Sequence, residues 1–337
     1  MDLDIRPVAE DEFAAFAATD HAAFGDVPPD DALARHRAAI DLGRTLAAFD
    51  GRRVAGTAYA FPFELTLPGR STVPAGGVSW VGVLPTHRRQ GVLTALMRRQ
   101  LADLRAWGEP VAILIASESI IYGRFGYGLA TTHTTYEIDR RHTALARPVV
   151  DDGSLELVTR DEAAAVLPGV HDRARRRQPG DVNRPPAMWE QFFGDDAGSG
   201  RRRLYVVHHD AAGEADGYAA HRRGTEGGLP DRTAVGLVDE LVSASAGAYA
   251  ALWSYVGNLD LVEKVRARCR PLDEPLRWML ADPRRLEARP CDFLWLRLVD
   301  LAGALEARGW ATEGGLVLEV DDSFCPWNAG RWRLDAG

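Results

Sequence analysis

The stretch SWVGVLPTHRRQGVLTALMRRQL, residues 79–101, restricts the fold more than any other part of the sequence. Apolar, β-branched and aromatic residues predict a strand over 78–84, which Pro85 ends because proline cannot donate to a continuing ladder. Apolar residues then recur with helical spacing at Leu93, Leu96, Met97, Leu101 and Leu104. The pattern therefore predicts a strand, a loop with a first helical turn over 86–91, and a buried helix.

The loop between this strand and this helix has the features of an anion site. The first N–H groups of a helix have no intrahelical partner and lie at the positive end of its dipole. Gly91 lets a ligand approach the backbone closely, and Arg88 and Arg89 supply guanidinium groups that suit phosphate oxygens. The loop is predicted to bind phosphate groups, although spacing alone leaves open a surface arginine pair before a core helix.

Two common phosphate-binding motifs do not fit this loop. A Walker loop needs GxxxxGK followed by Ser or Thr, and the nearest stretch, GVLPTHRRQGVL, has neither the lysine nor the hydroxyl. The dinucleotide fingerprint GxGxxG is absent, and no early βαβ unit precedes the loop. The ligand is therefore of another class.

The chain of 337 residues exceeds one comfortable hydrophobic core and predicts two or three domains. The ranges expected are 1–142, 150–285 and 288–337. In the first range, the strand over 78–84, the helix and an apolar run over 111–116 predict a parallel crossover in an otherwise antiparallel sheet. The second range alternates strands and helices without a phosphate loop. The third stops shortly after a strand-like RWRL, so it is expected to be a partial domain.

Composition and charge restrict the classes of partner that the protein is expected to bind. With 40 basic and 48 acidic residues the formal charge is −8, which argues against a nucleic-acid surface and suits a cationic partner. The arginine clusters at 173–177 and 201–203 are interpreted as solvated faces or subunit contacts. Cys269, Cys291 and Cys325 lack metal-ligand spacing, so no metal is expected. An acidic N-terminus and the lack of a long apolar run predict a cytoplasmic protein without a membrane partner.

Several motifs carry a family likeness. The run V-x-V-L-P-x-x-R-R-x-G-V resembles motif A of the GCN5-related N-acetyltransferases (GNAT), and SESIIYGRFGYGLATTH, residues 117–133, resembles the hallmark of the Eis (enhanced intracellular survival) family. Further similar stretches are RRRQPGDVNRPPAMWE, LVDELVSASAGAYAALWSYV, FLWLRLVDLAGALEARGW and FCPWNAGRW. The likeness extends over nearly the whole chain.

The resemblance implies a fold and an activity. The fold class is α/β (α+β), with two tandem GNAT-like domains, the central one degenerate, followed by a partial sterol-carrier-protein-like domain. The implied reaction is acetyl transfer from acetyl-CoA to an amine of a cationic acceptor, either an aminoglycoside-like small molecule or a protein lysine. The family also implies a homohexamer.

The resemblance further implies roles for individual residues. Backbone groups of Val81, Gly82 and Val83 would hold the cofactor, and Ser117 and Glu118 would line its pantetheine end. The pyrophosphate would lie on the segment Arg89, Gln90, Gly91, Val92, Leu93 and Thr94, with Arg88 at its rim. Tyr122 falls on the general acid. The acceptor pocket would be lined by Phe24, Asp26, Trp80 and Trp189.

Each of these roles has a plainer alternative, and one part of the family pattern is not matched. Tyr122 and Trp189 can be packed core aromatics, and Asp26 an ordinary turn residue. Adjacent His208 and His209 show no acidic partner in the sequence and are expected to be structural. Relatives use the carboxylate of their last residue as general base, for which Gly337 is a poor match. Either the sequence is a fragment or a carboxylate such as Asp26 acts through water, and a CoA-binding protein without turnover, serving in assembly or sensing, stays the alternative.

Overall fold

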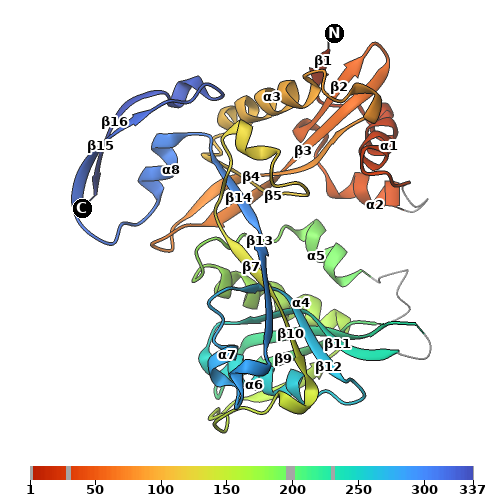
Figure 1. Ribbon diagram of the computed structural model, residues 1–337, viewed down its shortest axis with the longest axis vertical. Coiled ribbons are helices and arrows are strands. Elements are labelled where there is room, and N and C mark those ends of the chain that lie inside the picture. Colours follow the sequence, from red (N-terminus) through yellow and green to blue (C-terminus); the bar gives the residue numbers. More distant parts are fainter. Residues whose placement is uncertain (1–2, 28–31, 195–201, 229–231, 337) are drawn as a thin grey trace. The chain divides into compact units, whose positions relative to one another are not determined.

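The computed structural model describes residues 3–27, 32–194, 202–228 and 232–336 and divides into two compact units (Figure 1). The described residues of the first unit fall within 1–130, 178–187 and 294–337, and those of the second within 131–177 and 188–293. Each unit contains a seven-stranded sheet flanked by helices. The mixed α/β class predicted from the sequence is confirmed.

The sheet of the first unit has the order β1-β2-β3-β4-β5-β14-β6. Its strands are β1 (Asp4–Arg6), β2 (Thr45–Asp50), β3 (Arg53–Thr66), β4 (Thr72–Val83), β5 (Val111–Ile115), β14 (Leu294–Leu298) and β6 (Gly128–Leu129). Only β4 and β5 pair in parallel, and the connection between them contains α3 (Val92–Ala106). The predicted parallel crossover is confirmed.

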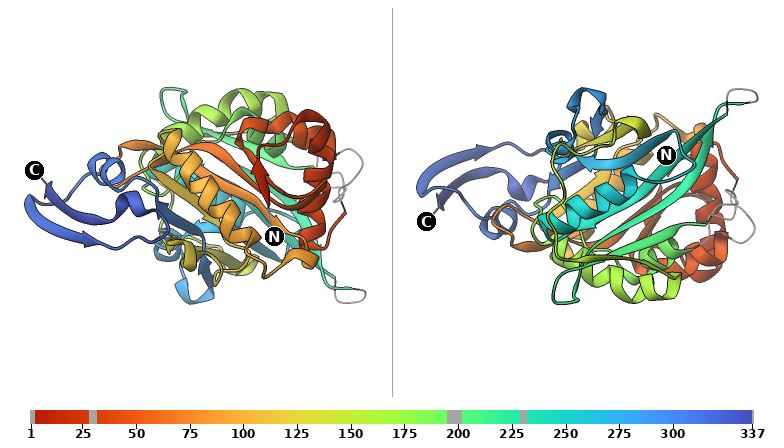
Figure 2. Two further views of the ribbon diagram at one scale, coloured as in Figure 1. Left: turned by 90° about the horizontal axis from the view of Figure 1, so that it is seen from above. Right: turned by 90° about the horizontal axis from the view of Figure 1, so that it is seen from below.

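Helices cover both faces of this sheet. A Cβ atom at Gly56 would meet the α3 side chains Val92 and Leu96, whereas the next residue, Thr57, faces Asp20 of α1 (Phe13–Phe24). Neighbouring residues of a strand point to opposite faces, so α3 and α1 lie on opposite sides. Figure 2 shows α3 running across the strands. The short helix α2 (Ala32–Ala39) lies on the α1 side, where His36 stacks on His21 with ring centroids 5.8 Å apart.

The second unit repeats this arrangement with a sheet of order β13-β7-β12-β11-β10-β9-β8. Its strands are β7 (Thr132–Asp139), β8 (Ser154–Val158), β9 (Leu204–His209), β10 (Ala215–Glu226), β11 (Thr233–Ser243), β12 (Lys264–Pro271) and β13 (Glu287–Asp292). Its helices are α4 (Arg160–Arg175), α5 (Pro186–Phe193), which begins at the boundary between the units, α6 (Ala246–Gly257) and α7 (Leu276–Met279). The one parallel pair, β11 with β12, is again joined by a helix, α6.

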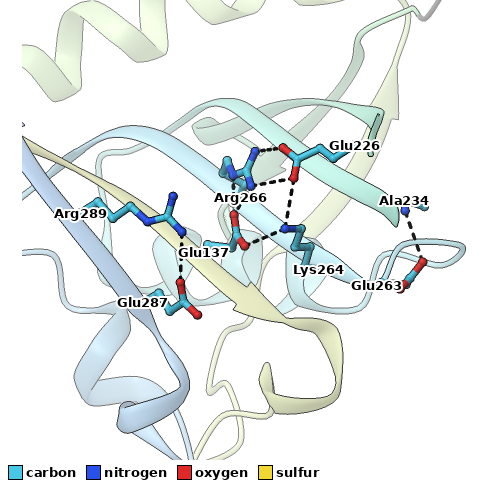
Figure 3. A network of polar contacts seen from close by, with 8 residues as sticks. All are labelled: Glu137, Glu226, Ala234, Glu263, Lys264, Arg266, Glu287 and Arg289. Atoms are coloured by element: carbon cyan, nitrogen blue, oxygen red, sulfur yellow. Dashed lines mark hydrogen bonds and ion pairs between the residues drawn. The ribbon is translucent and has the colours of Figure 1, made fainter. Parts of the chain in front are cut away.

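A charged network fastens β7 into the second sheet (Figure 3). Glu137 of β7 accepts hydrogen bonds from Lys264, at 2.8 Å, and from Arg266, both on β12. Glu226 at the end of β10 pairs with the same two cations. Since the carboxylates and cations alternate, each cation is shared by two carboxylates and the three strands are tied together.

Two strands lie outside the sequence ranges predicted for their domains. Strand β7, within the expected range 1–142, pairs with β12 and β13 in the second sheet. Strand β14, expected to open the third domain, instead lies between β5 and β6 in the first sheet. The structural units therefore divide the chain at other places than the predicted ranges, because the second unit begins at Thr131 and the first unit takes up β14 from Leu294 onward.

The rest of the first unit follows β14. Helix α8 (Leu301–Ala307) leads to a two-stranded sheet of β15 (Gly314–Val320) and β16 (Gly330–Ala336). Within the described residues, no helix is both long and apolar enough to cross a membrane.

Candidate active site

The first sheet opens between β4 and β5. The two strands pair over only three residues each, from Ala75 with Val111 to Gly77 with Ile113. Strand β4 continues to Val83, and beyond Gly77 its β5-facing edge has no strand partner among the described residues. Backbone N–H and C=O groups along this edge are therefore available to an extended ligand.

A β-bulge shapes the open part of β4. Thr57 of β3 pairs with Gly82 and Tyr59 with Ser79, so that Trp80 and Val81 together oppose Ala58. Trp80 has a φ of 50°, a strained value for a side chain of this size. The bulge bends the strand and redirects its backbone amides at the point where Val81, Gly82 and Val83 were predicted to hold the cofactor.

The N-terminus of α3 offers free amides at the end of this opening. The first intrahelical bond runs from the Ala95 N–H to the Gly91 carbonyl, so the amides of Val92, Leu93 and Thr94 precede the ladder. Gly91, the N-cap, has a φ of 87° and no side-chain cap, and nothing lies within 4 Å of where its Cβ would be. The geometry is that of an accessible anion site at a helix N-terminus.

The two arginines of the loop differ in their contacts. The Arg88 guanidinium donates to the carbonyl of Ala23, the next-to-last residue of α1, at 2.9 Å and to the Val83 carbonyl at 3.3 Å. Arg89 has a φ of 63° and an exposed side chain. Gln90 is exposed as well and donates to the Thr86 carbonyl. Arg88 therefore braces the loop against α1, and Arg89 is left to meet a ligand.

Tyr122 follows β5 on the far side of the opening. It begins the 3₁₀ turn η4 (Tyr122–Phe125), after an exposed turn that contains Ser117 and Glu118. Its ring packs edge-on against Tyr127 with centroids 5.8 Å apart, and burial raises the pKa of its phenol. The phenol is consequently protonated at neutral pH and able to donate a proton.

A buried ion pair supports the Tyr122 loop. The Arg297 guanidinium of β14 lies 2.5 Å from where a Cβ on Gly126 would be, so only glycine fits there. Arg297 pairs with Asp322 at 2.6 Å, and both side chains are less than 10% exposed. Asp322 also accepts the backbone N–H of Cys325 at 2.8 Å. The 322–325 turn therefore holds Arg297 against the loop.

Three of the predicted acceptor residues lie in the first unit. Phe24 and Asp26 are exposed at the end of α1, where the Asp26 carboxylate accepts the N–H of Val27. The Trp80 ring stacks on Phe16 at 5.9 Å and meets the edge of His36 at 5.1 Å. These contacts turn Trp80 toward the α1 and α2 side of the sheet.

Trp189 belongs to the second unit. It lies on α5, is 9% exposed, and stacks on Phe193 with centroids 5.6 Å apart. His171 of α4 meets its ring edge at 5.5 Å. Trp189 thus takes part in the core of the second unit, the structural role that the sequence left open.

The corresponding helix of the second unit is closed to anions. Its N-cap, Ser245, accepts the N–H of Ala248 and bonds Asp216 at 2.5 Å. A Cβ on Gly247 would lie 2.7 Å from the Asp151 carboxylate, so a second acid reaches the first turn of α6. Protein carboxylates thus lie at the positive end of the α6 dipole, where a phosphate would otherwise bind.

The same carboxylates correct one expectation from the sequence. His208 and His209 were expected to lack an acidic partner. The ring nitrogens of His208 bond Asp216 at 2.5 Å and Asp151 at 2.7 Å, and Nε2 of His209 lies 3.3 Å from the Glu156 carboxylate. The partners of His208 lie 8 and 57 residues away in the chain, too far apart for a local pattern to indicate. His208 is 1% exposed, so its role is structural as expected, but through a buried charged contact.

The sequence predictions did not name Asp20, a part-buried carboxylate of α1. Phe13, Phe16 and Ala17 form the buried stripe of α1, and Asp20 continues it one turn further. This heptad position was the signal that could have identified a carboxylate facing the sheet. Over the described ranges no group of three or more His, Cys, Asp or Glu side chains has the arrangement of a metal site.

Known proteins match this chain along its length. Residues 4–130 and 180–298 each match an acetyltransferase (GNAT) domain model, and residues 301–337 match a sterol carrier protein domain model. An uncharacterized N-acetyltransferase of Streptomyces avermitilis is 38% identical over 99% of this chain and 83% of the length of that protein. The N-acetyltransferase Eis of Mycobacterium tuberculosis is 38% identical over 85% of this chain and 70% of its own.

A solved structure agrees with these matches. The crystal structure of Eis1 from Mycobacterium abscessus superimposes with a TM-score of 0.86 at 36% identity, over 99% of this chain and 83% of that one. The tandem arrangement of two GNAT domains and a sterol-carrier-type segment is thus confirmed.

Proposed function

Because this chain belongs to the Eis family of GNAT N-acetyltransferases, we propose that it transfers the acetyl group of acetyl-CoA to an amine of a cationic acceptor, with Tyr122 as general acid. The observation that carries the proposal is the opening between β4 and β5, which joins the free amides of α3 to the Tyr122 turn. The GNAT fold implies acetyl-CoA as the donor substrate.

The residues of the opening fit this donor. The amides of Val92, Leu93 and Thr94, with Arg89 at the rim, would receive the pyrophosphate. The unpaired edge of β4 would pair with the extended pantetheine arm, which carries amide groups of its own. Ser117 and Glu118 would lie along that arm.

The chemistry needs polarisation of the thioester and two proton movements. A backbone amide near the bulge, from Val81 to Val83, would stabilise the oxyanion that forms when the amine attacks. The Tyr122 phenol would give its proton to the departing thiolate as the carbon–sulfur bond breaks. A lysine-like amine, with a pKa of about 10.4, must lose a proton before it attacks.

The proposed acceptor is an aminoglycoside-like small molecule or a protein lysine. A net charge of −8 favours a cationic acceptor, as does the exposed carboxylate of Asp26 at the end of α1. Phe24 and Trp80 are proposed to contribute apolar contacts to its pocket, whereas Trp189 packs in the core of the second unit. A homohexamer in the cytoplasm is part of the same proposal, supported by the family likeness; a monomer in light scattering would contradict the assembly.

The release of free CoA from acetyl-CoA, measured at steady state with a panel of aminoglycosides and lysine peptides, tests the activity. Tyr122→Phe should lower kcat by about 10²- to 10⁴-fold and leave acetyl-CoA affinity nearly unchanged. Tyr127→Phe is the matched control, because the neighbouring hydroxyl is buried without a hydrogen-bond partner in the described structure. Binding of acetyl-CoA without acetylation of any amine would favour the alternative, a CoA-binding protein of assembly or sensing.

A further inference from the structure

Arg88 joins the end of a helix to the end of a strand. Its guanidinium donates to the Ala23 carbonyl of α1 at 2.9 Å and to the Val83 carbonyl of β4 at 3.3 Å. Ala23 and Arg88 are 65 residues apart in the chain. The side chain therefore ties α1 to the strand whose bulged edge is assigned above to the acetyl thioester.

The last turn of α1 leaves one carbonyl for this bond. The helix closes at Gly25, whose N–H bonds the carbonyls of Ala22 and His21. The Ala23 carbonyl receives no backbone N–H within the described residues, and Arg88 donates to it instead. A cation is favoured here, because the carbonyl end of a helix is the negative end of its dipole.

The same turn packs on the bulged part of β4. A Cβ placed on Gly82 would lie 2.9 Å from the Cβ of Ala23, closer than Cβ atoms approach in proteins, so the helix end rests directly on the strand backbone. Phe24 and Asp26 follow in the chain, and both are exposed. A shift of this turn would therefore move the residues proposed for the acceptor relative to the amides proposed for the thioester.

Arg89, the next residue, makes none of these bonds. Its backbone is left-handed, with a φ of 63°, and its exposed side chain has no hydrogen-bond or ion-pair partner among the described residues. The two arginines carry the same charge, but only Arg88 is held by the protein. They therefore form a matched pair for an experiment.

We propose that Arg88 is a positioning residue for the acceptor: it holds the end of α1, with Phe24 and Asp26, against the β4 bulge, and it does not bind acetyl-CoA. The inference rests on the proposed function. A misplacement of about 1 Å between reacting groups can cost about 10²-fold in rate. Loss of Arg88 should consequently impair the use of the acceptor, while the amides of α3 keep the diphosphate.

Steady-state kinetics test this role with the aminoglycoside or lysine peptide of the panel above that gives the highest kcat/KM. Arg88→Gln should lower kcat/KM for this amine by about 10- to 100-fold at saturating acetyl-CoA, and leave the acetyl-CoA affinity measured by calorimetry unchanged within about twofold. The direction is informative, because removal of a positive charge would by itself favour a cationic amine. Arg88→Lys keeps the charge but lacks the planar fork that reaches both carbonyls, so it should restore only part of the loss.

Arg89→Gln is the matched control, since it removes the same charge one residue away. It should show the reverse pattern: acetyl-CoA binds about tenfold more weakly, and kcat/KM for the amine at saturating acetyl-CoA changes by less than about threefold. Amide hydrogen exchange adds a measurement without turnover. The N–H groups of Gly25 and Asp26, which close α1, should exchange at least about fivefold faster in Arg88→Gln and at the wild-type rate in Arg89→Gln.

The outcomes separate the two proposals. If Arg88→Gln weakens acetyl-CoA binding as much as Arg89→Gln does, Arg88 is a ligand of the cofactor. If kcat/KM for the amine rises or stays within about threefold of the wild type, or the exchange at Gly25 and Asp26 is unchanged, the end of α1 does not depend on Arg88. Each of these results overturns the role of Arg88 although acetyl transfer stands. If the wild type acetylates no amine, the proposed function fails and the role of Arg88 fails with it.

Discussion

At residue 91 one glycine meets two separate demands. A φ of 87° is costly for most side chains, and the space above the residue is open. Glycine therefore permits the turn into α3 and leaves the amides that follow open to the diphosphate proposed above. Asn and Asp tolerate this backbone conformation better than other side chains, and they are nearly identical in shape.

That pair of side chains isolates the effect of charge at the anion site. Gly91→Asp should weaken acetyl-CoA binding by at least about tenfold, because a carboxylate at the N-cap takes the place of the diphosphate, while as a cap it preserves the helix. Gly91→Asn should bind clearly more tightly than Gly91→Asp at equal thermal stability. Calorimetric titration with acetyl-CoA measures both, and equal affinities would show that the diphosphate lies elsewhere.

At the residue scale, the sequence points to positions where the residue type alone indicates a function. Gly91, Arg88 and Arg89 are predicted to form an anion site because glycine and paired arginines beside a helix start indicate one. Asp20 and His208 could not be predicted, because their significance depends on burial and on partners that the fold brings from other strands.

At the scale of elements, the Tyr122 loop depends on a segment almost 200 residues further along the chain. Phe324 packs against Phe125 with centroids 5.2 Å apart, and Arg297 fills the space beside Gly126. The sequence predicted the strand over 111–116, and the loop after it that carries Tyr122, because both follow from neighbouring residues. The contact of this loop with Arg297 and Phe324 follows only from the position of β14 in the first sheet.

Breaking the Arg297–Asp322 pair should therefore affect both stability and turnover. Asp322→Asn leaves a buried guanidinium without its counterion and should lower the free energy of unfolding by about 3–5 kcal/mol. kcat should fall as the loop that carries Tyr122 loosens, with a smaller effect on acetyl-CoA affinity.

An exposed pair of the same type provides the control. Arg333 and Asp335 of β16 are 78% and 64% exposed, so Asp335→Asn should leave both properties nearly unchanged. Denaturant unfolding and steady-state kinetics measure the two effects. Equal stability of the two variants would mean that the buried pair contributes nothing to the loop.

At the scale of the whole molecule, the sequence could not predict which sheet β7 and β14 each join. The apolar run of β14 indicates a strand, and it is one, whereas no strand was predicted over β7. The pattern does not specify which sheet a strand joins, since both sheets offer an apolar core and an edge for pairing. The ranges 1–142 and 288–337 consequently assigned each strand to its neighbours in sequence.

Stability of the second unit should depend on pH through the Asp151–His208–Asp216 contact. The hydrogen bonds and charges of both carboxylates raise the pKa of His208 above its ordinary value, in opposition to burial. A raised pKa means that the folded state binds the proton more tightly than the unfolded state. The stabilisation is thus fully present below about pH 6.5, the ordinary histidine pKa, and is lost as the pH rises through the folded pKa.

Thermal unfolding, monitored by amide hydrogen exchange, shows which elements of the chain carry this pH dependence of stability. Amides of β9 and α6, the elements that the contact joins, should lose protection as the pH is raised from about 6 to about 9, after correction for the intrinsic exchange rate. His208→Gln should abolish the pH dependence, because glutamine carries no proton to lose. His209→Gln is the neighbouring control, since that ring lies on the opposite face of β9, where it bonds the Gly213 carbonyl and its acidic neighbour, Glu156, is 64% exposed. If both variants keep the wild-type dependence of protection on pH, the loss of protection arises from another group. The histidine between the two carboxylates then does not hold its proton more tightly in the folded chain.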